Sequence, residues 1–303
     1  MLVNYQEQLN VIKNIRNGKL KEGLKLDIPE LDEYIRFKPS NFNIILGHAN
    51  VGKTTSILYL MLCYSLKHGL KWLVCSTEND SYSLIRKLIE FMEETPINLI
   101  SEHNFKTQAD FINKHFKFVD NSVMYDYHSA IEMFKEVKKD YNYQGILLDP
   151  YNALTKDNEL MKNLGGHEYD YQACTEMRMF CKENKVSMWL NTHANSNALR
   201  MVHRNEHQFA GHPIPPMASD VEGGGKFVNR ADDFIVVHRY TLHPTLYTTT
   251  MLHIRKVKEI ETGGRPTSME NPIEIVALTD NVGFSINGKS ILRTIKESQL
   301  TYL

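Results

Sequence analysis

Apolar and polar positions alternate along the chain in a way that predicts strands separated by helices. Short, mostly apolar runs lie at positions 42–46, 71–76, 116–120, 145–149 and 186–192. Between them, apolar residues recur at helical spacing, for example in 54–69 and 129–141. Apolar strands that alternate with helices are typical of a parallel sheet covered on both faces. The pattern therefore predicts an α/β fold with a mostly parallel sheet flanked by helices.

The last third of the chain has a different pattern. Strand-like runs at 232–240, 248–258 and 272–280 follow one another without a long helical segment between them. Because parallel neighbours need a long crossover, we expect these strands to extend the C-terminal edge of the sheet in antiparallel orientation. Two further stretches, 152–167 and 194–226, are predicted to be long loops, and loops of more than about 15 residues are usually functional or disordered.

The first 22 residues form a pattern of their own. Six apolar residues occur among polar ones at roughly helical spacing: Leu2, Val3, Leu9, Val11, Ile12 and Ile15. They predict a partly amphipathic helix that ends near Gly18. Its apolar face packs either on a neighbouring subunit or on its own core, because periodicity marks a buried face without naming the partner. We therefore divide the chain into an N-terminal linker or oligomerisation helix, 1–22, and one domain, 23–303.

Composition narrows the class of protein. The 303 residues include 42% hydrophobic ones, which suits a packed core. Since no run of about 18 apolar residues and no signal-peptide pattern is present, we expect a cytoplasmic protein without a membrane partner. The four cysteines are scattered through apolar segments and are expected to be reduced core thiols. The net charge of -1 excludes a globally basic nucleic-acid coat, but allows a local basic loop or a channel formed by several subunits.

The segment IILGHANVGKTT, residues 44–55, carries the first candidate chemistry. Its spacing fits G-x-x-x-x-G-K-[ST], in which glycines let the backbone wrap a phosphate chain, the lysine neutralises it and the hydroxyl binds magnesium. An apolar run precedes the motif and a helical pattern follows it, which places the phosphates at a helix N-terminus. The predicted cofactors are ATP or a dNTP with Mg²⁺, bound by Gly47, His48, Ala49, Asn50, Val51, Gly52, Lys53, Thr54 and Thr55.

Hydrolysis of a triphosphate also needs a carboxylate that positions the metal and a group that orients water. Asp149 ends the apolar run 145–149, at the carboxyl edge where open α/β sheets bind ligands. Glu78 follows the run 71–76 and should emerge at the same edge. Alternatively, either acid caps the following helix, and near Glu78 the acid Asp80 also fits a cap.

The order of these motifs resembles a known family. The segments LKLDIPELDEYI, GHANVGKTT, STEND, GILLDP, NTHANSN and RKVKEIETGG follow one another as in the RecA-type motor domain of DnaB-class hexameric replicative helicases. From about residue 23 onward the chain is similar to phage primase-helicases and Twinkle, without their primase domain. The resemblance implies a RecA-like P-loop NTPase that assembles into a ring, expected to be a hexamer, and translocates on single-stranded DNA. Hydrolysis would take place between subunits, and a separate primase or helicase loader would be a further partner.

The resemblance also implies roles for single residues. Glu78 matches the catalytic glutamate that polarises the attacking water, and Asp149 matches the magnesium-positioning acid. His193 lies where the family has a polar residue that senses the γ-phosphate; alternatively, it only ends a strand. Lys256 and Lys258 resemble a Lys-x-Arg pair that reaches into the neighbouring subunit's nucleotide.

That pair departs from the family, because its second position is Lys258 and the nearest arginine is Arg255. Arginine forks around phosphate oxygens whereas lysine is a point charge, so the identity of the trans-acting finger stays open, with Lys258 favoured. Alternatively, these residues form a basic edge strand that discourages aggregation.

The stretch SDVEGGGKFVNRADDFIVVHR resembles the family's DNA-binding loop and the helix and strand that follow it. Gly223, Gly224 and Gly225 can bring backbone N–H groups close to a phosphate, and Lys226 adds charge. Arg230 is assigned to the same surface. Alternatively, the glycines mark only a flexible loop.

Two other functions fit the sequence. A RecA-type strand-exchange or filament protein shares the core and the nucleotide chemistry, and a non-motor regulatory ATPase would use nucleotide binding as an assembly switch. A zinc site at His203, His207 and His212 is disfavoured, because no cysteine or tight ligand set accompanies them.

Overall fold

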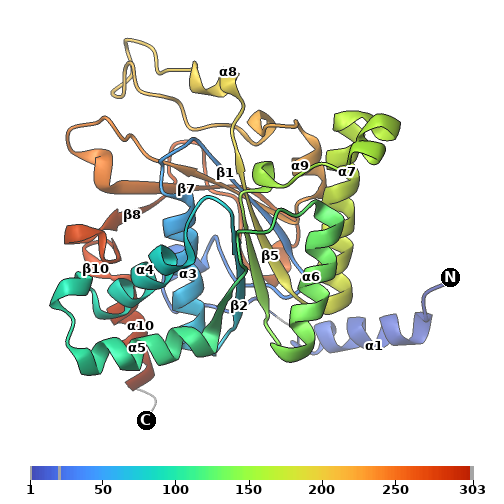
Figure 1. The fold of residues 1–303 in the computed structure, drawn as a ribbon, viewed down its shortest axis with the longest axis horizontal. Coiled ribbons are helices and arrows are strands. Elements are labelled where there is room, and N and C mark those ends of the chain that lie inside the picture. The colour runs from blue at the N-terminus through green and yellow to red at the C-terminus, as the bar shows by residue number, and fades with distance from the viewer. Residues whose placement is uncertain (1, 20–21, 301–303) are drawn as a thin grey trace.

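One mixed sheet organises the structure, a computed structural model that describes residues 2–19 and 22–300. In this part of the chain ten strands lie in the order β10-β9-β8-β7-β6-β1-β5-β4-β2-β3 (Figure 1). The strands are β1 (Phe42–Gly47), β2 (Trp72–Ser76), β3 (Phe116–Phe118), β4 (Gly145–Asp149), β5 (Ser187–His193), β6 (Asp233–His238), β7 (Thr249–Val257), β8 (Ile273–Ala277), β9 (Phe284–Ile286) and β10 (Lys289–Ser290). The helices are α1 (Tyr5–Arg16), α2 (Pro29–Asp32), α3 (Lys53–His68), α4 (Ser81–Glu93), α5 (Glu102–His115), α6 (Tyr127–Asp140), α7 (Asn158–Asn184), α8 (Ser196–Leu199), α9 (Lys226–Arg230) and α10 (Ile291–Leu300).

The sheet has a parallel part and an antiparallel part. β1 pairs in parallel with both β5 and β6, and β5, β4, β2 and β3 continue the parallel order. From β6 outward the pairs β6–β7, β7–β8, β8–β9 and β9–β10 are antiparallel. The predicted fold class, with antiparallel strands at the C-terminal edge, is therefore confirmed.

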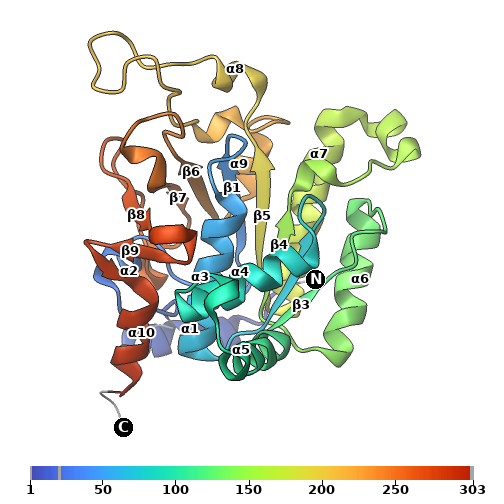
Figure 2. The same cartoon turned by 60° about the vertical axis from the view of Figure 1, so that its left-hand side comes forward.

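Helices cover the two faces of the sheet and create two cores (Figures 1 and 2). One core packs α3, α4, α5 and α10 against the sheet around Trp72 and Trp189, whose rings meet edge to face at 6.2 Å. The other core packs α6, α7 and α9 on the opposite face. Neighbouring residues of β1 serve different cores, since Ile45 belongs to the first and Ile44 to the second. Strands buried on both faces explain why their sequences are apolar throughout.

The predicted loop at 152–167 is wrong for most of its length. α7 begins at Asn158, where the carboxylate of Asp157 accepts hydrogen bonds from the N–H groups of Glu159 and Leu160. The helix is kinked at Gly165, which has a φ of 75°. The glycine pair thus marks a kink inside a helix rather than a loop, because the cap and the apolar residues before it already start helical structure. Residues 194–226 are mostly irregular, as predicted.

The N-terminal helix α1 has the predicted character, but it does not fold onto its own chain. None of its residues is buried, and Val11, Ile12 and Ile15 are each about half exposed. Figure 1 shows it extending away from the body of the domain. Packing on its own core is therefore excluded for the described residues. The predicted ranges 1–22 and 23–303 also include positions 1, 20–21 and 301–303, which lie outside the described residues.

Other sequence expectations concern membrane spans and thiols. Among the described residues, we find no helix with the length and apolar character needed to cross a bilayer. The four cysteines are buried and unpaired, and they belong to the two cores.

Two histidines are buried side by side in the sheet. His238 of β6 and His253 of β7 are 1% and 2% exposed, and both ring nitrogens of each lack a hydrogen-bond partner among the described residues. Burial lowers the pKa of each to about 3, and neighbouring histidines or Arg255 act in the same direction. Both imidazoles are therefore neutral at physiological pH.

Candidate active site

The predicted phosphate-binding loop connects β1 to α3. Gly52 caps α3 with a φ of 84°, a left-handed conformation that favours glycine. Gly47 has no room for a side chain, since a Cβ there would lie 2.5 Å from the carbonyl oxygen of Val237 in β6. The amino end of a 16-residue helix, with its free N–H groups, therefore opens onto the loop.

Lys53 lies over the loop beside both candidate acids. Its Nζ donates to the carbonyl oxygens of Gly47 at 3.0 Å and His48 at 2.8 Å. Burial lowers the pKa of Lys53, and the charges of Asp149 and Glu78 act against that shift. The ammonium group is thus placed where it can meet an anion at the amino end of α3.

Asp149 ends β4 and is the best-buried acid of the site. Its Oδ2 accepts from the hydroxyl groups of Thr54 at 2.8 Å and Ser76 at 3.2 Å, and its Oδ1 accepts from Asn191 Nδ2 at 2.6 Å. Burial raises the pKa of Asp149, while these hydrogen bonds lower it. The structure therefore brings the two predicted magnesium ligands, Thr54 and Asp149, into direct contact.

A hydroxyl and a carboxylate at this spacing fit Mg²⁺, which prefers oxygen ligands and usually takes only one or two from the protein. In the described part of the chain, no group of three or more His, Cys, Asp or Glu side chains could hold a metal ion. His203 and His207 instead stack with their ring centroids 4.0 Å apart, and His203 also contacts the hydroxyl of Tyr240. The histidine-rich segment is thus an aromatic cluster.

Glu78 and His193 complete the group. Glu78 follows β2, and its Oε1 lies 3.2 Å from His193 Nε2. The other ring nitrogen of His193, Nδ1, lies 3.4 Å from Lys53 Nζ. Their strands are close in the sheet although they are distant in sequence, because the order β1-β5-β4-β2 brings four carboxyl ends to one edge. His193 therefore bridges the lysine and the candidate base.

These side chains line a pocket of about 580 Å³ that also contains a residue missed in the sequence. Arg239 follows β6, and its Nη2 would be 2.9 Å from a Cβ placed on Gly52. Its guanidinium donates to the hydroxyl of Thr250 in β7. The signal available was a charged residue directly after an apolar run. What the sequence did not reveal is that β6 is a neighbour of β1.

The two finger candidates lie away from this pocket. β7 runs antiparallel to β6, so Lys256 and Lys258 lie at the amino end of β6, opposite the phosphate-binding loop. At about 3.3 Å per residue, the length of β1 alone separates the two ends by roughly 15 Å. Lys256 Nζ donates to the carbonyl oxygen of Val228 at 2.7 Å, and Lys258 Nζ lies 3.3 Å from Asp232 Oδ1.

The glycine loop precedes α9 on the other face of the sheet. Gly223 and Gly224 have φ values of 102° and 89°. A Cβ on Gly223 would lie 2.9 Å from the ring of Phe227 and 3.1 Å from Asp170, so a glycine is needed there. Gly224 and Gly225 have open space where a side chain would be, which leaves their backbone accessible to a ligand.

The basic residues of this loop are less exposed than the sequence suggested. Lys226 is 6% exposed, and its Nζ has no hydrogen-bond partner among the described residues. Burial lowers the pKa of Lys226, and the charges of Glu168 and Asp170 oppose that shift. The guanidinium of Arg230 lies 4.1 Å from the centre of the Tyr171 ring. Both cations are therefore fixed against α7 rather than free in solvent.

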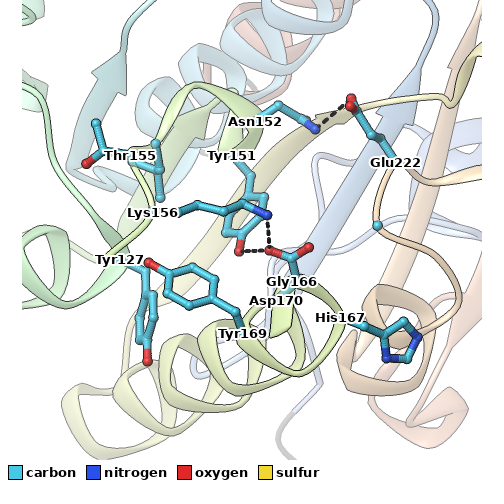
Figure 3. Close-up of a pocket in the computed structure, with 12 residues that line it drawn as sticks. Tyr127, Tyr151, Asn152, Thr155, Lys156, Gly166, His167, Tyr169, Asp170 and Glu222 are labelled. Carbon is cyan, nitrogen blue, oxygen red and sulfur yellow. Dashed lines mark hydrogen bonds and ion pairs between the residues drawn. The ribbon is translucent and has the colours of Figure 1, made fainter. Parts of the chain in front are cut away.

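A second pocket, of about 370 Å³, lies between α7, the segment after β4 and the glycine loop (Figure 3). Asp170 accepts hydrogen bonds there from Tyr151 at 2.8 Å and Lys156 at 3.1 Å. At its rim, Asn152 Nδ2 donates to Glu222 at 2.9 Å. The pocket thus places the segment after Asp149 against the predicted DNA loop.

Comparison with solved structures identifies the architecture. A DnaB-like helicase ATPase domain, solved as a separate domain, superposes with a TM-score of 0.74 over 94% of this chain and 99% of that chain, at 14% sequence identity. A DnaB-like replicative helicase, solved in a study of its interactions with primase, gives 0.70 over 94% of this chain and 67% of its own, at 15% identity. The fold is that of a DnaB-like helicase ATPase domain. The predicted resemblance to DnaB-class motor domains is thus confirmed.

More distant and sequence-based comparisons agree. A KaiC-like protein from Pyrococcus horikoshii shares the fold with a TM-score of 0.57 over 88% of this chain and 97% of its own, at 16% identity. In sequence, the chain is 25% identical over 232 residues to the chloroplastic and mitochondrial Twinkle homologue of Arabidopsis thaliana. That match covers 72% of this chain and 30% of the relative, so the chain corresponds to less than a third of the relative's length. No protein-family model matches the sequence.

Proposed function

We propose that this chain is the motor of a replicative DNA helicase that hydrolyses ATP or a dNTP and translocates on single-stranded DNA as a ring. One observation carries the proposal: Lys53, Thr54, Glu78, Asp149 and His193 meet in one pocket of a fold shared with helicase ATPase domains. The helicase and Twinkle resemblances favour this function over a recombinase filament or a regulatory ATPase.

The pocket supports hydrolysis by in-line attack of water on the γ-phosphorus. The backbone from Gly47 to Thr55 would hold the phosphates, with Lys53 neutralising the β- and γ-oxygens. Glu78 would orient the water and take its proton while the bond to the leaving diphosphate breaks. Bound between Thr54, Asp149 and the phosphates, Mg²⁺ would neutralise charge that develops in the transition state. His193, which contacts both Lys53 and Glu78, is suited to sense the γ-phosphate.

The finger requires a second subunit. Lys256 and Lys258 lie at the opposite end of the sheet from their own pocket, so they can only reach a nucleotide bound by a neighbouring copy. We assign the trans-acting role to Lys258, with Lys256 beside it, because Lys258 is 44% exposed in its side chain and its partner Asp232 is also held by Arg178. An active site shared in this way predicts a homo-oligomer, which we expect to be a hexamer.

The DNA contact is assigned to Gly223, Gly224, Gly225, Lys226 and Arg230. The accessible backbone of the glycines and the unpartnered ammonium of Lys226 suit a phosphate group. A chain with a net charge of -1 would then bind DNA through local groups repeated around a ring. The exposed apolar face of α1 would pack on the adjacent subunit as an oligomerisation helix. A primase or loader as an additional partner, and a cytoplasmic location, remain predictions.

Turnover with and without oligo-dT tests the function directly. We expect DNA to stimulate hydrolysis in the wild type, and negative-stain images with nucleotide and oligo-dT to show closed six-fold rings. Lys53→Ala protein is the control for contaminating ATPase. Continuous filaments would instead support a recombinase, and turnover that ignores DNA in protein without rings would support a regulatory ATPase.

A further inference from the structure

The side chain of Asn152 joins three segments that carry different parts of the proposed reaction. Asn152 follows Asp149 by three positions, in the short turn after β4. Its Oδ1 accepts hydrogen bonds from the hydroxyl of Thr192 at 2.9 Å and from the backbone N–H of His193 at 3.1 Å. Its Nδ2 donates to Glu222 Oε2 at 2.9 Å. One amide therefore links the Asp149 strand, the end of β5 and the residue before the glycine loop (Figure 3).

The orientation of this amide follows from its partners. A backbone N–H only donates, so the atom of Asn152 that faces His193 must be the oxygen. A carboxylate only accepts, so the atom that faces Glu222 must be the nitrogen. Each end of the amide thus has a partner that it alone can satisfy. Neither a leucine nor an aspartate would make both contacts.

The backbone reinforces the same connection. The N–H of Glu222 donates to the carbonyl oxygen of His193 at 3.0 Å, and Ala194 forms a bridge with Val221. The last residues of β5 and the residues before the glycine loop therefore move together or break these bonds. Since the ring of His193 contacts Lys53 and Glu78, a displacement at the γ-phosphate site is transmitted to Glu222 over a short chain of contacts.

Glu222 is an acid placed next to the residues assigned to DNA phosphate. It is exposed, and the carboxylate is oriented by Asn152 rather than by a cation. A phosphate that enters the glycine loop would repel this carboxylate, so the state of the Asn152–Glu222 hydrogen bond depends on DNA as well as on the position of β5.

We propose that Asn152 is a positioning residue that couples nucleotide state to DNA affinity by holding Glu222 to the end of β5. This inference rests on the proposed function, because it requires that the glycine loop binds DNA. In physical terms, the hydrogen bond has different free energy in the two nucleotide states, and DNA affinity differs between them by a corresponding factor.

The test measures the coupling, so it does not depend on turnover. The dissociation constant of fluorescent oligo-dT is determined by anisotropy with ADP–Mg²⁺ and with a non-hydrolysable ATP analogue–Mg²⁺. The ratio of the two constants is the coupling ratio, and couplings between sites are typically about 5–150-fold. Thermal unfolding of every variant shows whether the fold is intact.

Asn152→Asp severs one arm of the link and keeps the other. Its remaining oxygen still accepts from His193, but the new carboxylate opposes Glu222. We expect the coupling ratio to fall to about one. Combining Asn152→Asp with Glu222→Gln exchanges donor and acceptor, so the ratio should return. Glu222→Gln alone still accepts from Asn152 and should keep the ratio, as should Glu206→Gln, the same charge change at an exposed position of the 194–226 segment.

The outcomes separate this inference from the proposed function. Wild-type protein that does not bind oligo-dT, or binds it equally in both nucleotide states, would overturn the proposed function and the coupling with it. A wild-type ratio that persists in Asn152→Asp would overturn the role of Asn152 alone. Loss without recovery in the double variant would also overturn it, since the loss would then come from the added charge. If Asn152→Asp does not fold, Glu222→Ala cuts the same bond from an exposed residue, and an unchanged ratio there has the same meaning.

Discussion

The nucleotide pocket and the basic residues outside it differ in how far a single chain completes them. In the pocket, the candidate groups contact one another: Thr54 meets Asp149, and His193 meets both Lys53 and Glu78. Outside it, the assigned cations are occupied by the same chain or buried.

The cause of this difference lies in the sheet. Parallel strands deliver their carboxyl ends to one edge, so hydrolytic groups from distant segments meet without help from a second chain. Lys256 and Lys258 instead lie on an antiparallel strand and are held by Val228 and Asp232. They must exchange an internal partner for an external one. We infer that the chain prepares the chemistry of hydrolysis by itself, and that subunits and DNA regulate when it proceeds.

The largest effect is expected where the pocket is most complete. Lys53→Ala removes the charge that meets the phosphates, and Glu78→Gln removes the water-polarising carboxylate while keeping its shape. Both should lower turnover by up to about 10⁴-fold, but only Glu78→Gln should retain tight nucleotide binding. Steady-state ATPase and nucleotide titrations measure the two properties. Asp80→Asn is the matched control, and loss of turnover there with normal turnover in Glu78→Gln would move the base to Asp80.

The next effect concerns the finger. Lys258→Ala should leave nucleotide binding intact, while DNA-stimulated turnover falls on the order of 10³-fold, as for other trans-acting fingers. The half-exposed Lys258–Asp232 pair should contribute less than about 1 kcal/mol to stability, so unfolding would not explain the loss.

Mixing sharpens this prediction. A subunit with Glu78→Gln still offers Lys258 to its neighbour, and a subunit with Lys258→Ala still offers Glu78. Mixed assemblies should therefore regain activity at some interfaces. Full activity of Lys258→Ala alone would remove it from the finger. Inactive mixtures with demonstrated co-assembly would mean that the site is not shared or that the ring tolerates no dead interface.

A smaller effect is expected at the glycine loop. Lys226→Ala should weaken oligo-dT binding about tenfold for all sequences and reduce the salt slope by about one. Its ammonium is buried without a partner among the described residues, so the folded state should lose no hydrogen bond when it is removed. Anisotropy titrations at several salt concentrations test this, with the exposed Lys162→Ala as control. Equal affinity and slope in both variants would place the DNA elsewhere.

The smallest effect on stability is expected in α1. Val11→Ser and Ile15→Ser replace exposed apolar residues, so the free energy of unfolding of the monomer should change by less than about 0.5 kcal/mol. If α1 packs on a neighbour, the same changes should reduce the oligomeric fraction in mass photometry. Unchanged assembly would separate α1 from the subunit interface.

The sequence predicted the parts of the fold and site that depend on local patterns. Apolar runs and the spacing from Gly47 to Thr54 were sufficient to predict the strands, the phosphate loop and the acids at strand ends. Strand order was not encoded locally, so Arg239 was missed although it lies against Gly52. Gly165 and Gly166 suggested a loop, because the pattern did not show that Asp157 would start a helix before them.

Burial of charge was also beyond local prediction. Lys226 follows three glycines and suggested an exposed cation, but packing of α9 against α7 encloses it. Similarly, the sequence around Asn152 gave no indication of its role, since its three partners come from positions 40 or more residues away.

The buried histidines of β6 and β7 make the folded domain sensitive to acid. His238 and His253 have pKa values of about 3 in the fold, whereas an unfolded chain takes up protons on histidine near pH 6.5. Between these values the unfolded chain binds more protons than the fold, so stability is complete above about pH 6.5 and declines as the pH falls. Each histidine changes the free energy of unfolding by about 1.4 kcal/mol per pH unit in that window. Protons therefore act as ligands of the unfolded state, and they weaken the two strands that lie beside the phosphate-binding loop.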